Sequence, residues 1–327
     1  MPDYPKISIV TPSFNQGEFI EETILSVITQ NYPNLEYIII DGGSTDGSVD
    51  IIKKYEKYLS YWVSEPDKGH GDALNKGFVR TTGDIMAWVN SDDKYFPWTL
   101  ETVAQVFTQH EDINWIVGLY SNFDRKGSIT SVRAEYRNIY SYIFRDLHIQ
   151  QESVFWRRAM WTKTGGYIDA SKPLMIDTEL WCRFFLQDEL WHLDRVLGGY
   201  RMTGLNRAHV FKKEVEADVN KSLTYLVEHL PEEKKRLLEN IKRYSIDLRY
   251  YYKKIDEISG SLNKNLLLQA TPHFLYQQAH NFFFRKSMEK QNLATPIQPT
   301  HDSLVIRRLL SENDKWVKQD MAYQFPY

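Results

Sequence analysis

Two adjacent carboxylates, Asp92 and Asp93, close the segment Ile85–Asp93, whose first five residues are apolar. A buried strand with acids at its carboxyl end presents them where open α/β sheets bind ligands. Neighbouring carboxylates repel each other unless a cation or a donor-rich ligand lies between them. Mg²⁺ and Mn²⁺ prefer such oxygen ligands and often share them with a substrate's phosphates. The pattern therefore indicates a divalent-cation site, and a plain strand-end turn is the alternative, because Asn, Ser and Asp are common there.

Two earlier apolar runs also end in small, polar or acidic residues. The run at 7–10 is followed by Thr11, Pro12 and Phe14, and the run at 37–40 is followed by Asp41. No G-x-G-x-x-G follows the first run and no G-x-x-x-x-G-K-[ST] is found, which argues against a dinucleotide site and an ATPase-type phosphate loop. A nucleotide can still lie with its base against Thr11, Phe14 and Asp41 and with its diphosphate on a cation held by the acid pair.

The elements that must position these residues alternate along the first half of the chain. Apolar runs at 7–10, 37–40, 61–63 and 85–89 predict buried strands, and apolar residues at helical spacing predict helices between them. This alternation predicts right-handed crossovers and a largely parallel, doubly wound sheet over residues 1 to about 120. Further strands are predicted at 115–117, 128–132, 149–156 and 193–200, with a helix at 177–186.

From about residue 205 the sequence changes character. Residues 211–258 are rich in Lys, Glu, Leu and Tyr at helical spacing with a break at Pro231, and 304–310 predicts one more short helix. Residues 205–327 carry a net charge of +5, in a chain whose total is −3. Clusters such as Lys234-Lys235-Arg236 are usually the solvated face of a helix, although they also suit contact with a membrane surface. The segment could alternatively cover an acceptor site or mediate self-association.

The bulk composition is that of an ordinary globular protein, with 42% apolar and 25% charged residues in a chain of 327. The net charge of −3 gives no reason to expect nucleic acid as a partner. The single cysteine, Cys182, excludes an internal disulfide and lies in an apolar helical pattern, as a core residue would. We find no signal-like leader and no apolar run of membrane-spanning length. These features predict a cytoplasmic protein, with peripheral contact at the inner face of a membrane as an alternative.

Five ordered motifs resemble one known family. They are Ile9-Val10-Thr11-Pro12-Ser13-Phe14-Asn15, Ser-Val-Ile-Thr-Gln-Asn-Tyr-Pro at 26–33, Ile-Asp-Gly-Gly-Ser-Thr-Asp-Gly-Ser at 40–48, Leu-Asn-Lys-Gly-Phe at 74–78 and Asn-Ser-Asp-Asp at 90–93. In order and spacing they are similar to the inverting family 2 nucleotide-sugar glycosyltransferases of the A-type fold, over roughly residues 6–205. The resemblance implies an α/β fold, with a mostly parallel sheet flanked by helices and a mainly helical C-terminal extension. The expected catalytic domain covers 1–210, with a donor half at about 1–120 and an acceptor half at about 121–210, and the extension covers 211–327.

The resemblance also implies roles for the residues at the strand ends. Asp41 is expected to contact the donor base, and Asp92 and Asp93 are expected to form the ribose and metal motif, with Mn²⁺ or Mg²⁺ as cofactor. The remaining expected donor contacts are Thr11, Pro12, Phe14, Asp72 and Asn75. Family members usually have an acid where Asn90 stands, so the sequence leaves open which carboxylate is the main metal ligand. A histidine that can ligate metal in the family is missing here, because Tyr200-Arg201 is followed by Met202-Thr203.

The expected catalytic base lies at the start of the helix predicted at 177–186. Asp177 matches the family's base, whereas Ile176 stands where the family usually has Glu. An apolar neighbour would raise the pKa of the Asp177 carboxylate by desolvation, which suits a proton acceptor. A helix cap is the alternative role for Asp177, and Glu179 is the alternative base. Trp156, Trp161 and Trp181 are expected in the core, with at most one of them stacked on an acceptor sugar.

Together these residues predict metal-dependent transfer of a sugar from a nucleoside-diphosphate sugar to an acceptor hydroxyl, with inversion. A UDP-sugar is the favoured donor by resemblance, and a glycan or lipid-linked glycan is the expected acceptor, in the synthesis of polysaccharide, lipopolysaccharide or glycoconjugate for the cell envelope. Two other classes stay open at this point. One is a sugar-1-phosphate nucleotidyltransferase, although the segment after the first strand lacks that class's glycine-rich loop with a Lys. The other is a non-catalytic protein that binds nucleotide sugars, in view of Asn90, Ile176 and the missing histidine.

Overall fold

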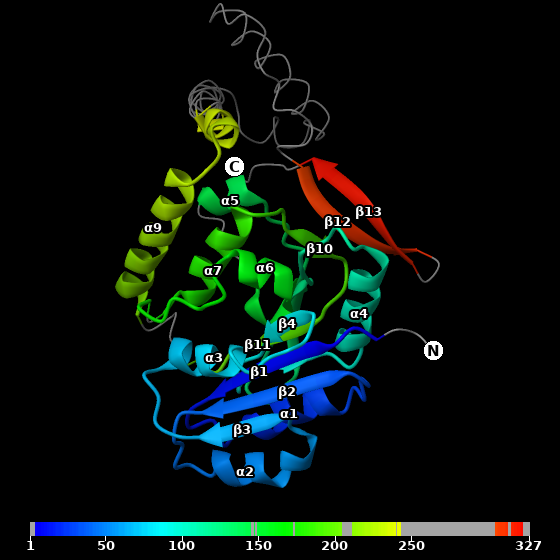
Figure 1. The fold of residues 1–327 in the computed structure, drawn as a ribbon, viewed down its shortest axis with the longest axis vertical. Helices are drawn as coiled ribbons and strands as arrows, with labels where there is room; N and C mark the ends of the chain where they lie inside the picture. Colours follow the sequence, from blue (N-terminus) through cyan, green and yellow to red (C-terminus); the bar gives the residue numbers. More distant parts are fainter. Residues whose placement is uncertain are drawn as a thin grey trace, which may run out of the picture. The chain divides into compact units, whose positions relative to one another are not determined.

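The computed structural model describes residues 4–144, 147, 149–172, 174–204, 211–239, 241–242, 305–312 and 315–322. Its first 90 residues form the parallel half of a nine-stranded sheet (Figure 1). The strands β1 (Ile7–Ser13), β2 (Leu35–Asp41), β3 (Tyr61–Ser64) and β4 (Ile85–Trp88) pair in the order β4-β1-β2-β3, all parallel. The connecting helices are α1 (Ile20–Ile28), α2 (Ser48–Lys54) and α3 (His70–Phe78). This arrangement confirms the alternating pattern predicted from the sequence.

Beyond β4 the sheet becomes mixed. The strand β9 (Val154–Arg157) runs antiparallel to both β4 and β6 (Trp115–Val117), and β10 (Trp191–Leu193) follows parallel to β6. A second sheet has the order β5 (Lys94–Tyr95), β11 (Gly198–Arg201), β7 (Tyr120–Phe123) and β8 (Ile129–Arg133). The later α-helices up to residue 229 are α4 (Thr99–Gln109), α5 (Ile139–Ile143), α6 (Arg158–Lys163), α7 (Ile176–Phe185) and α9 (Lys212–Glu228).

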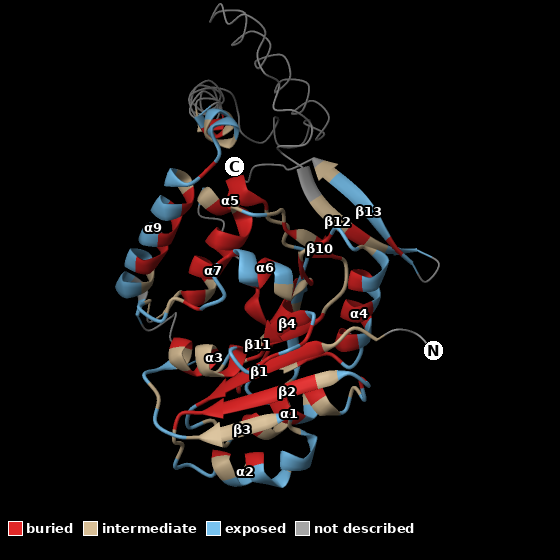
Figure 2. Ribbon diagram, viewed as in Figure 1, coloured by how far each residue is buried: buried red, intermediate tan, exposed pale blue. Residues whose placement is uncertain are grey.

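A cluster of tryptophans forms the core beneath the carboxyl end of β4. The rings of Trp88 and Trp181 stack with their centroids 5.7 Å apart, and Trp156 meets both rings edge-on. Figure 2 shows the central strands β1 and β4 buried throughout and β2 buried apart from its first residue, whereas β3 at the edge is only partly covered. Trp156, Trp161 and Trp181 are all buried, with at most 5% of any of them exposed, so these rings are core residues. None of them is placed to stack on an acceptor sugar.

Three predicted elements differ in the structure. Residues 305–310, in the segment 304–310 predicted as a helix, lie in the strand β12 (Val305–Glu312). This strand pairs with β13 (Lys315–Ala322) along its whole length and with β10 at Arg307–Leu309. A short run of apolar residues does not distinguish a helix from a strand, so the secondary structure here depends on the strands with which the segment pairs. The strand predicted at 149–156 begins only at Val154, after a 3₁₀ turn over Gln151–Ser153. The strand predicted at 193–200 is two strands, β10 and β11, in different sheets.

The chain divides into two compact units, one comprising Met1–His229 with Val305–Tyr327 and the other Leu230–Leu304. In the second unit, residues 232–239 are helical, after Pro231 as the sequence predicted. Residues 243–304 lie outside the described part of the chain, so the predicted helix at 211–258 is tested only over its first part. The domain boundary near 210 stays a prediction. Among the residues that the structure describes, no helix is long and apolar enough to span a membrane.

Glu36 on β2 ties together the amino ends of the first strands. Its buried carboxylate accepts hydrogen bonds from Lys6 Nζ (2.8 Å), Ser8 Oγ (2.6 Å) and Thr82 N (2.6 Å). Burial alone raises the pKa of Glu36, but these hydrogen bonds outweigh it and lower the pKa to about 2. A carboxylate whose pKa is lower in the folded state stabilises the fold above its unfolded pKa, and the contribution is lost as the pH falls.

We therefore expect Glu36→Gln to lower the free energy of unfolding at pH 7 by on the order of 1–3 kcal/mol. The difference between variant and parent should narrow as the pH falls from about 5 towards about 3, because the parent's carboxylate becomes protonated in the unfolded chain first. Urea unfolding at several pH values measures it, with the exposed Glu56→Gln as control. A difference that does not depend on pH would contradict the assignment.

Candidate active site at the carboxyl ends of the parallel strands

The acid loop, residues Asn90–Asp93, leaves the end of β4 and carries the two carboxylates in different surroundings. Asp93 is 1% exposed, and its Oδ1 accepts a hydrogen bond from the backbone N of Arg201 (2.7 Å) while its Oδ2 accepts one from Asn90 Nδ2 (3.2 Å). The Asp92 side chain is only partly buried. No hydrogen bond from another residue that the structure describes reaches the Asp92 carboxylate. The two acids are therefore not equivalent, and Asp92 is the one available to a ligand.

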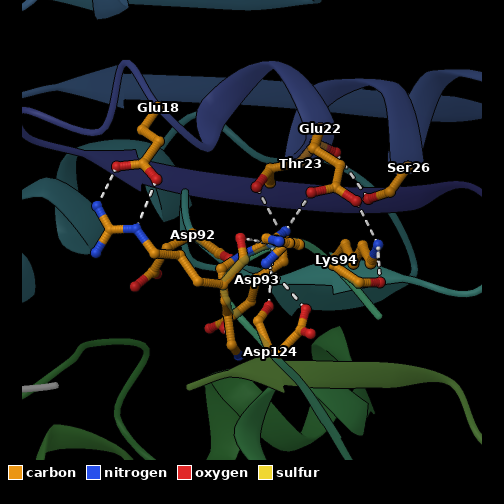
Figure 3. Close-up of polar contacts among 12 residues, drawn as sticks. Glu18, Glu22, Thr23, Ser26, Asp92, Asp93, Lys94 and Asp124 are labelled. Atoms are coloured by element: carbon orange, nitrogen blue, oxygen red, sulfur yellow. Dashed lines mark hydrogen bonds and ion pairs between the residues drawn. The ribbon is translucent and has the colours of Figure 1, made fainter. Parts of the chain in front are cut away.

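The backbone of the acid loop is fixed by residues that are distant in sequence. Thr23 on α1 donates through Oγ1 to the carbonyl oxygens of Ser91 (3.0 Å) and Asp93 (2.6 Å). Arg201, at the end of β11, is fully buried and donates through Nε to the Asp92 carbonyl oxygen (2.6 Å). Its guanidinium also binds Glu22 of α1. Figure 3 shows Glu22, Thr23 and Lys94 among the polar residues around the acid loop. A buried Arg that is paired and hydrogen-bonded in this way fixes geometry, because its donors have fixed directions.

A further acid, Glu152, lies against the acid loop and was not predicted from the sequence. It sits in the 3₁₀ turn before β9, is 4% exposed, and shares a hydrogen bond with Asp93. Burial, together with the nearby carboxylates of Asp177 and Asp92, raises the pKa of Glu152 to about 7. Burial and the charges of Glu152 and Asp92 also raise the pKa of Asp93 well above its usual range. Both shifts favour the protonated forms, and one proton between Asp93 and Glu152 would relieve the repulsion of their charges.

Asp177 lies in the first turn of α7, close enough to Glu152 for their charges to interact. The N-cap of α7 is Met175, so Asp177 does not have the capping role that was its alternative. Its Oδ1 accepts a hydrogen bond from the backbone N of Thr178 (2.7 Å), and burial raises the pKa of its carboxyl to about 6. The predicted direction of this pKa shift is confirmed, and a carboxylate with such a pKa suits a general base near neutral pH.

The alternative base, Glu179, is engaged elsewhere. Both of its carboxylate oxygens bind Arg183, one turn later on α7, at 2.9 Å and 2.8 Å. Glu179 is 8% exposed and Arg183 6%, so the ion pair is buried. With both oxygens engaged by one guanidinium, the Glu179 carboxylate is not open to an acceptor hydroxyl. The structure therefore favours Asp177 over Glu179 as the base.

The residues predicted to hold the nucleotide lie at the ends of β1 and β2. Asp41 is fully buried and accepts hydrogen bonds from Gly43 N (3.1 Å), Ser44 N (2.8 Å) and Ser64 Oγ (2.6 Å). Thr11 and Pro12 are buried in β1, and Thr11 Oγ1 is hydrogen-bonded to the hydroxyl of Tyr37. Phe14, by contrast, is 60% exposed just beyond β1. Of this set, the ring of Phe14 is the group most open to a base, whereas Asp41 shapes the loop beside it.

The two residues predicted on α3 have roles within the fold. Asp72 accepts a hydrogen bond from Lys68 N (3.0 Å), across the turn that opens the helix. Asn75 donates to the carbonyl oxygen of Ile168 (2.9 Å) and accepts from its N (2.8 Å). The side chain of Asn75 thus joins α3 to the loop before α7, which holds the donor half against the half that carries Asp177. Direct contact of Asp72 or Asn75 with a donor stays a prediction.

The surroundings of the acids decide which of them fits a divalent cation. Both Asp93 oxygens accept protein hydrogen bonds, and Asp93 is also paired with Glu152, so Asp93 is the less open of the two acids and its metal role stays a prediction. Asp92, which is partly exposed, does fit, because hard cations take carboxylate oxygens and complete their coordination with phosphates and water. Within the described ranges no group of three or more His, Cys, Asp or Glu is arranged to hold a metal. A cation here would thus depend on the substrate for most of its ligands.

Comparison with known proteins identifies the family. Residues 8–164 match the sequence profile of Glycosyl transferase family 2. An uncharacterised glycosyltransferase of Mycobacterium tuberculosis is 28% identical over 208 residues, which cover 63% of this chain and 78% of that protein. The putative teichuronic acid biosynthesis glycosyltransferase TuaG of Bacillus subtilis is 40% identical over 94 residues, which cover 28% of this chain and 37% of TuaG.

Solved structures share the fold at low sequence identity. TarS of S. aureus, residues 1–349 in complex with UDP, has a TM-score of 0.51 at 20% identity, over 68% of this chain and 71% of that chain. The mannosyltransferase PcManGT from Pyrobaculum calidifontis, in complex with GDP-Man and Mn2+, has a TM-score of 0.50 at 13% identity, over 89% and 88%. The profile covers the strands β1 to β4 and the acid loop that follows β4. Residues 8–164 therefore form a family 2 glycosyltransferase domain, and the chain has the A-type fold of these solved structures.

Proposed function

We propose that the chain transfers a sugar from a nucleoside-diphosphate sugar to an acceptor hydroxyl with inversion at the anomeric carbon. The observation that carries the proposal is the position of Asp177, a carboxyl with a raised pKa close to Glu152, the acid that is hydrogen-bonded to Asp93 of the acid loop. A base at this place can take the proton of a hydroxyl that attacks from the side opposite the leaving nucleoside diphosphate. Direct displacement of this kind inverts the anomeric configuration.

The residues of the acid loop supply the other half of the chemistry. Asp92 would hold a divalent cation, Mn²⁺ or Mg²⁺, which when bound neutralises charge on the leaving diphosphate. Asp93 and Glu152 are buried, and hydrogen bonds from Arg201 and Thr23 hold the backbone of the acid loop. Preorganised groups of this kind need no rearrangement as charge develops in the transition state. The exposed ring of Phe14 would cover the nucleotide base.

The comparisons support a nucleotide-sugar donor and suggest its type. Solved structures of TarS contain UDP or UDP-GlcNAc, and that of PcManGT contains GDP-Man with Mn2+. We propose a UDP-sugar as the donor and a glycan or lipid-linked glycan as the acceptor, in the synthesis of a cell-envelope polysaccharide, as the name of TuaG suggests for that relative. We further propose that transfer takes place in the cytoplasm, with α9 and the residues after it contributing acceptor, membrane or subunit contacts.

A panel of nucleotides tests the donor. A ligand that binds only the folded state stabilises it by mass action. At a ligand concentration of 100 times the Kd, the free energy of unfolding rises by about 2.7 kcal/mol, and the melting temperature rises with it. UDP and UDP-sugars with Mn²⁺ should raise the melting temperature of the whole chain, and the same nucleotides with a chelator should raise it less. NAD is the control and should have no effect. Stabilisation by NAD and by no nucleoside diphosphate would contradict the proposed function.

A further inference from the structure

Asn90, which stands where the family usually has an acid, is surrounded by groups that require an amide. Its Nδ2 donates to Asp93 Oδ2 and to Gln151 Oε1, both at 3.2 Å. Its Oδ1 lies 3.1 Å from His70 Nε2. The two partners of Nδ2 are acceptors in this arrangement, so the atom between them must carry hydrogens.

The orientation of Gln151 fixes the direction of these hydrogen bonds. Gln151 Nε2 donates to the carbonyl oxygen of Trp88 at 2.7 Å, so its Oε1 is the atom that faces Asn90. Gln151 is 6% exposed and cannot exchange this partner for bulk water. The Trp88 carbonyl oxygen thus accepts from Gln151, Gln151 Oε1 accepts from Asn90, and Asn90 Oδ1 accepts from His70 Nε2. This series of hydrogen bonds links β4, the turn before β9 and the first residue of α3.

The charge around Asn90 points the same way. Asp92, Asp93 and Glu152 interact electrostatically with one another, and Glu152 also interacts with Asp177. A further carboxylate at position 90 would face an oxygen of Asp93 and an oxygen of Gln151, where the native residue has two hydrogen-bond donors. Like charges in a buried place destabilise one another strongly because little water screens them.

We propose that Asn90 is a positioning residue that orders the acid loop as a hydrogen-bond donor, so that the acid usual in the family would weaken the donor site of this chain. Asn90 thus completes a network in which Gln151 and His70 are its matched partners. The part of this inference that concerns donor binding rests on the proposed function. The part that concerns the loop does not, because it follows from the hydrogen bonds alone.

The test compares Asn90→Asp, Asn90→Ala and the parent chain, first without ligand and with a chelator present. Loss of the amide donor leaves the buried acceptors on Asp93 and Gln151 unpaired. We expect melting temperatures in the order parent, Ala, Asp, with Asn90→Asp lower than the parent by roughly 2–10 °C. The double variant Asn90→Asp, Asp93→Asn again has one amide donor between positions 90 and 93. It should recover part of the melting temperature that Asn90→Asp loses. Asn34→Asp, at an exposed position, is the matched control and should change little.

The second measurement is the Kd of UDP in the presence of Mn²⁺. We expect Asn90→Asp to raise this Kd about tenfold or more, with Asn90→Ala between it and the parent. An Asn90→Asp chain that melts at or above Asn90→Ala, or that binds UDP with Mn²⁺ more tightly than the parent, would overturn the proposal. If the melting order is as expected but the parent binds no nucleotide, the proposed function fails while the role of Asn90 in the loop stands.

Discussion

Asp177→Asn should abolish most sugar transfer while leaving nucleotide binding nearly unchanged. The amide keeps the size of the side chain but cannot accept a proton at neutral pH. A positioned general base contributes about 10²–10⁴-fold to a rate, so the turnover number should fall by that factor. Binding of the donor should change little, because Asp177 lies on α7 and not among the strand-end residues at Asp41 and Phe14. Transfer assays with saturating donor, together with calorimetric titration of UDP, measure both quantities.

The pH dependence gives this prediction a second readout. Because burial raises the pKa of Asp177 to about 6, transfer by the parent should fall about tenfold for each pH unit below that value. The residual rate of Asp177→Asn should lack this dependence. Asp50→Asn is the matched control, since Asp50 also lies in the first turn of a helix, α2, but is exposed and on another element. An Asp177→Asn chain that keeps most of its transfer rate would place the base elsewhere.

Asp92→Asn should weaken metal-linked donor binding far more than Asp93→Asn does. Removing even an outer partner of a metal ligand typically costs 10–100-fold in affinity, and Asp92 is the proposed ligand itself, so a loss of at least about that size is expected. Asp93→Asn should instead lower the melting temperature, by roughly 2–8 °C, because one amide group cannot accept from both Arg201 N and Asn90 Nδ2. Titration of UDP with and without Mn²⁺, alongside melting without ligand, separates the two effects.

We expect each variant to lose a different property: Asp92→Asn loses metal-linked affinity, and Asp93→Asn loses thermal stability. A general loss of structure would not produce this difference. Asp92→Asn should melt close to the parent because its carboxylate is partly exposed. Asp124→Asn is a suitable control, since Asp124 is an acid of the neighbouring β7–β8 turn that accepts hydrogen bonds from Lys126 N and Ser128 N. If Asp93→Asn loses Mn²⁺-dependent affinity and Asp92→Asn does not, the two acids have been assigned the wrong way round.

The residues that the sequence could place are those whose neighbours are local. Asp41 and the acid loop follow apolar runs directly, and the ends of parallel strands meet at one edge of a sheet, so their common location could be predicted. Asp177 was found because a motif of the family surrounds it. Its raised pKa followed from the apolar residues beside it, and the structure gives the same direction.

The residues that the sequence could not place act across long distances in the chain. Glu152 lay inside a predicted strand, where a single acid gives no periodic signal, and only the 3₁₀ turn brings it to Asp93. Arg201 is 108 residues from Asp93, and nothing near it in sequence reveals that its backbone binds that acid. The role of Asn75 was predicted from a motif, although both ends of its amide are paired with Ile168. In each of these cases the role of the residue depends on a contact with a residue distant in sequence, and a local sequence pattern does not predict such contacts.

The hairpin of β12 and β13 bears on how this chain is made. Both strands follow residue 304 in the sequence, yet β12 pairs with β10. Leu309 of β12 and Trp316 of β13 are buried. While the chain leaves the ribosome, β10 is complete more than 100 residues before its partner emerges. Until then it presents an open strand edge, the surface through which unfinished sheets associate with one another. Premature termination or slow synthesis beyond β10 should therefore favour aggregation, even though every residue of the acid loop and Asp177 has already been made.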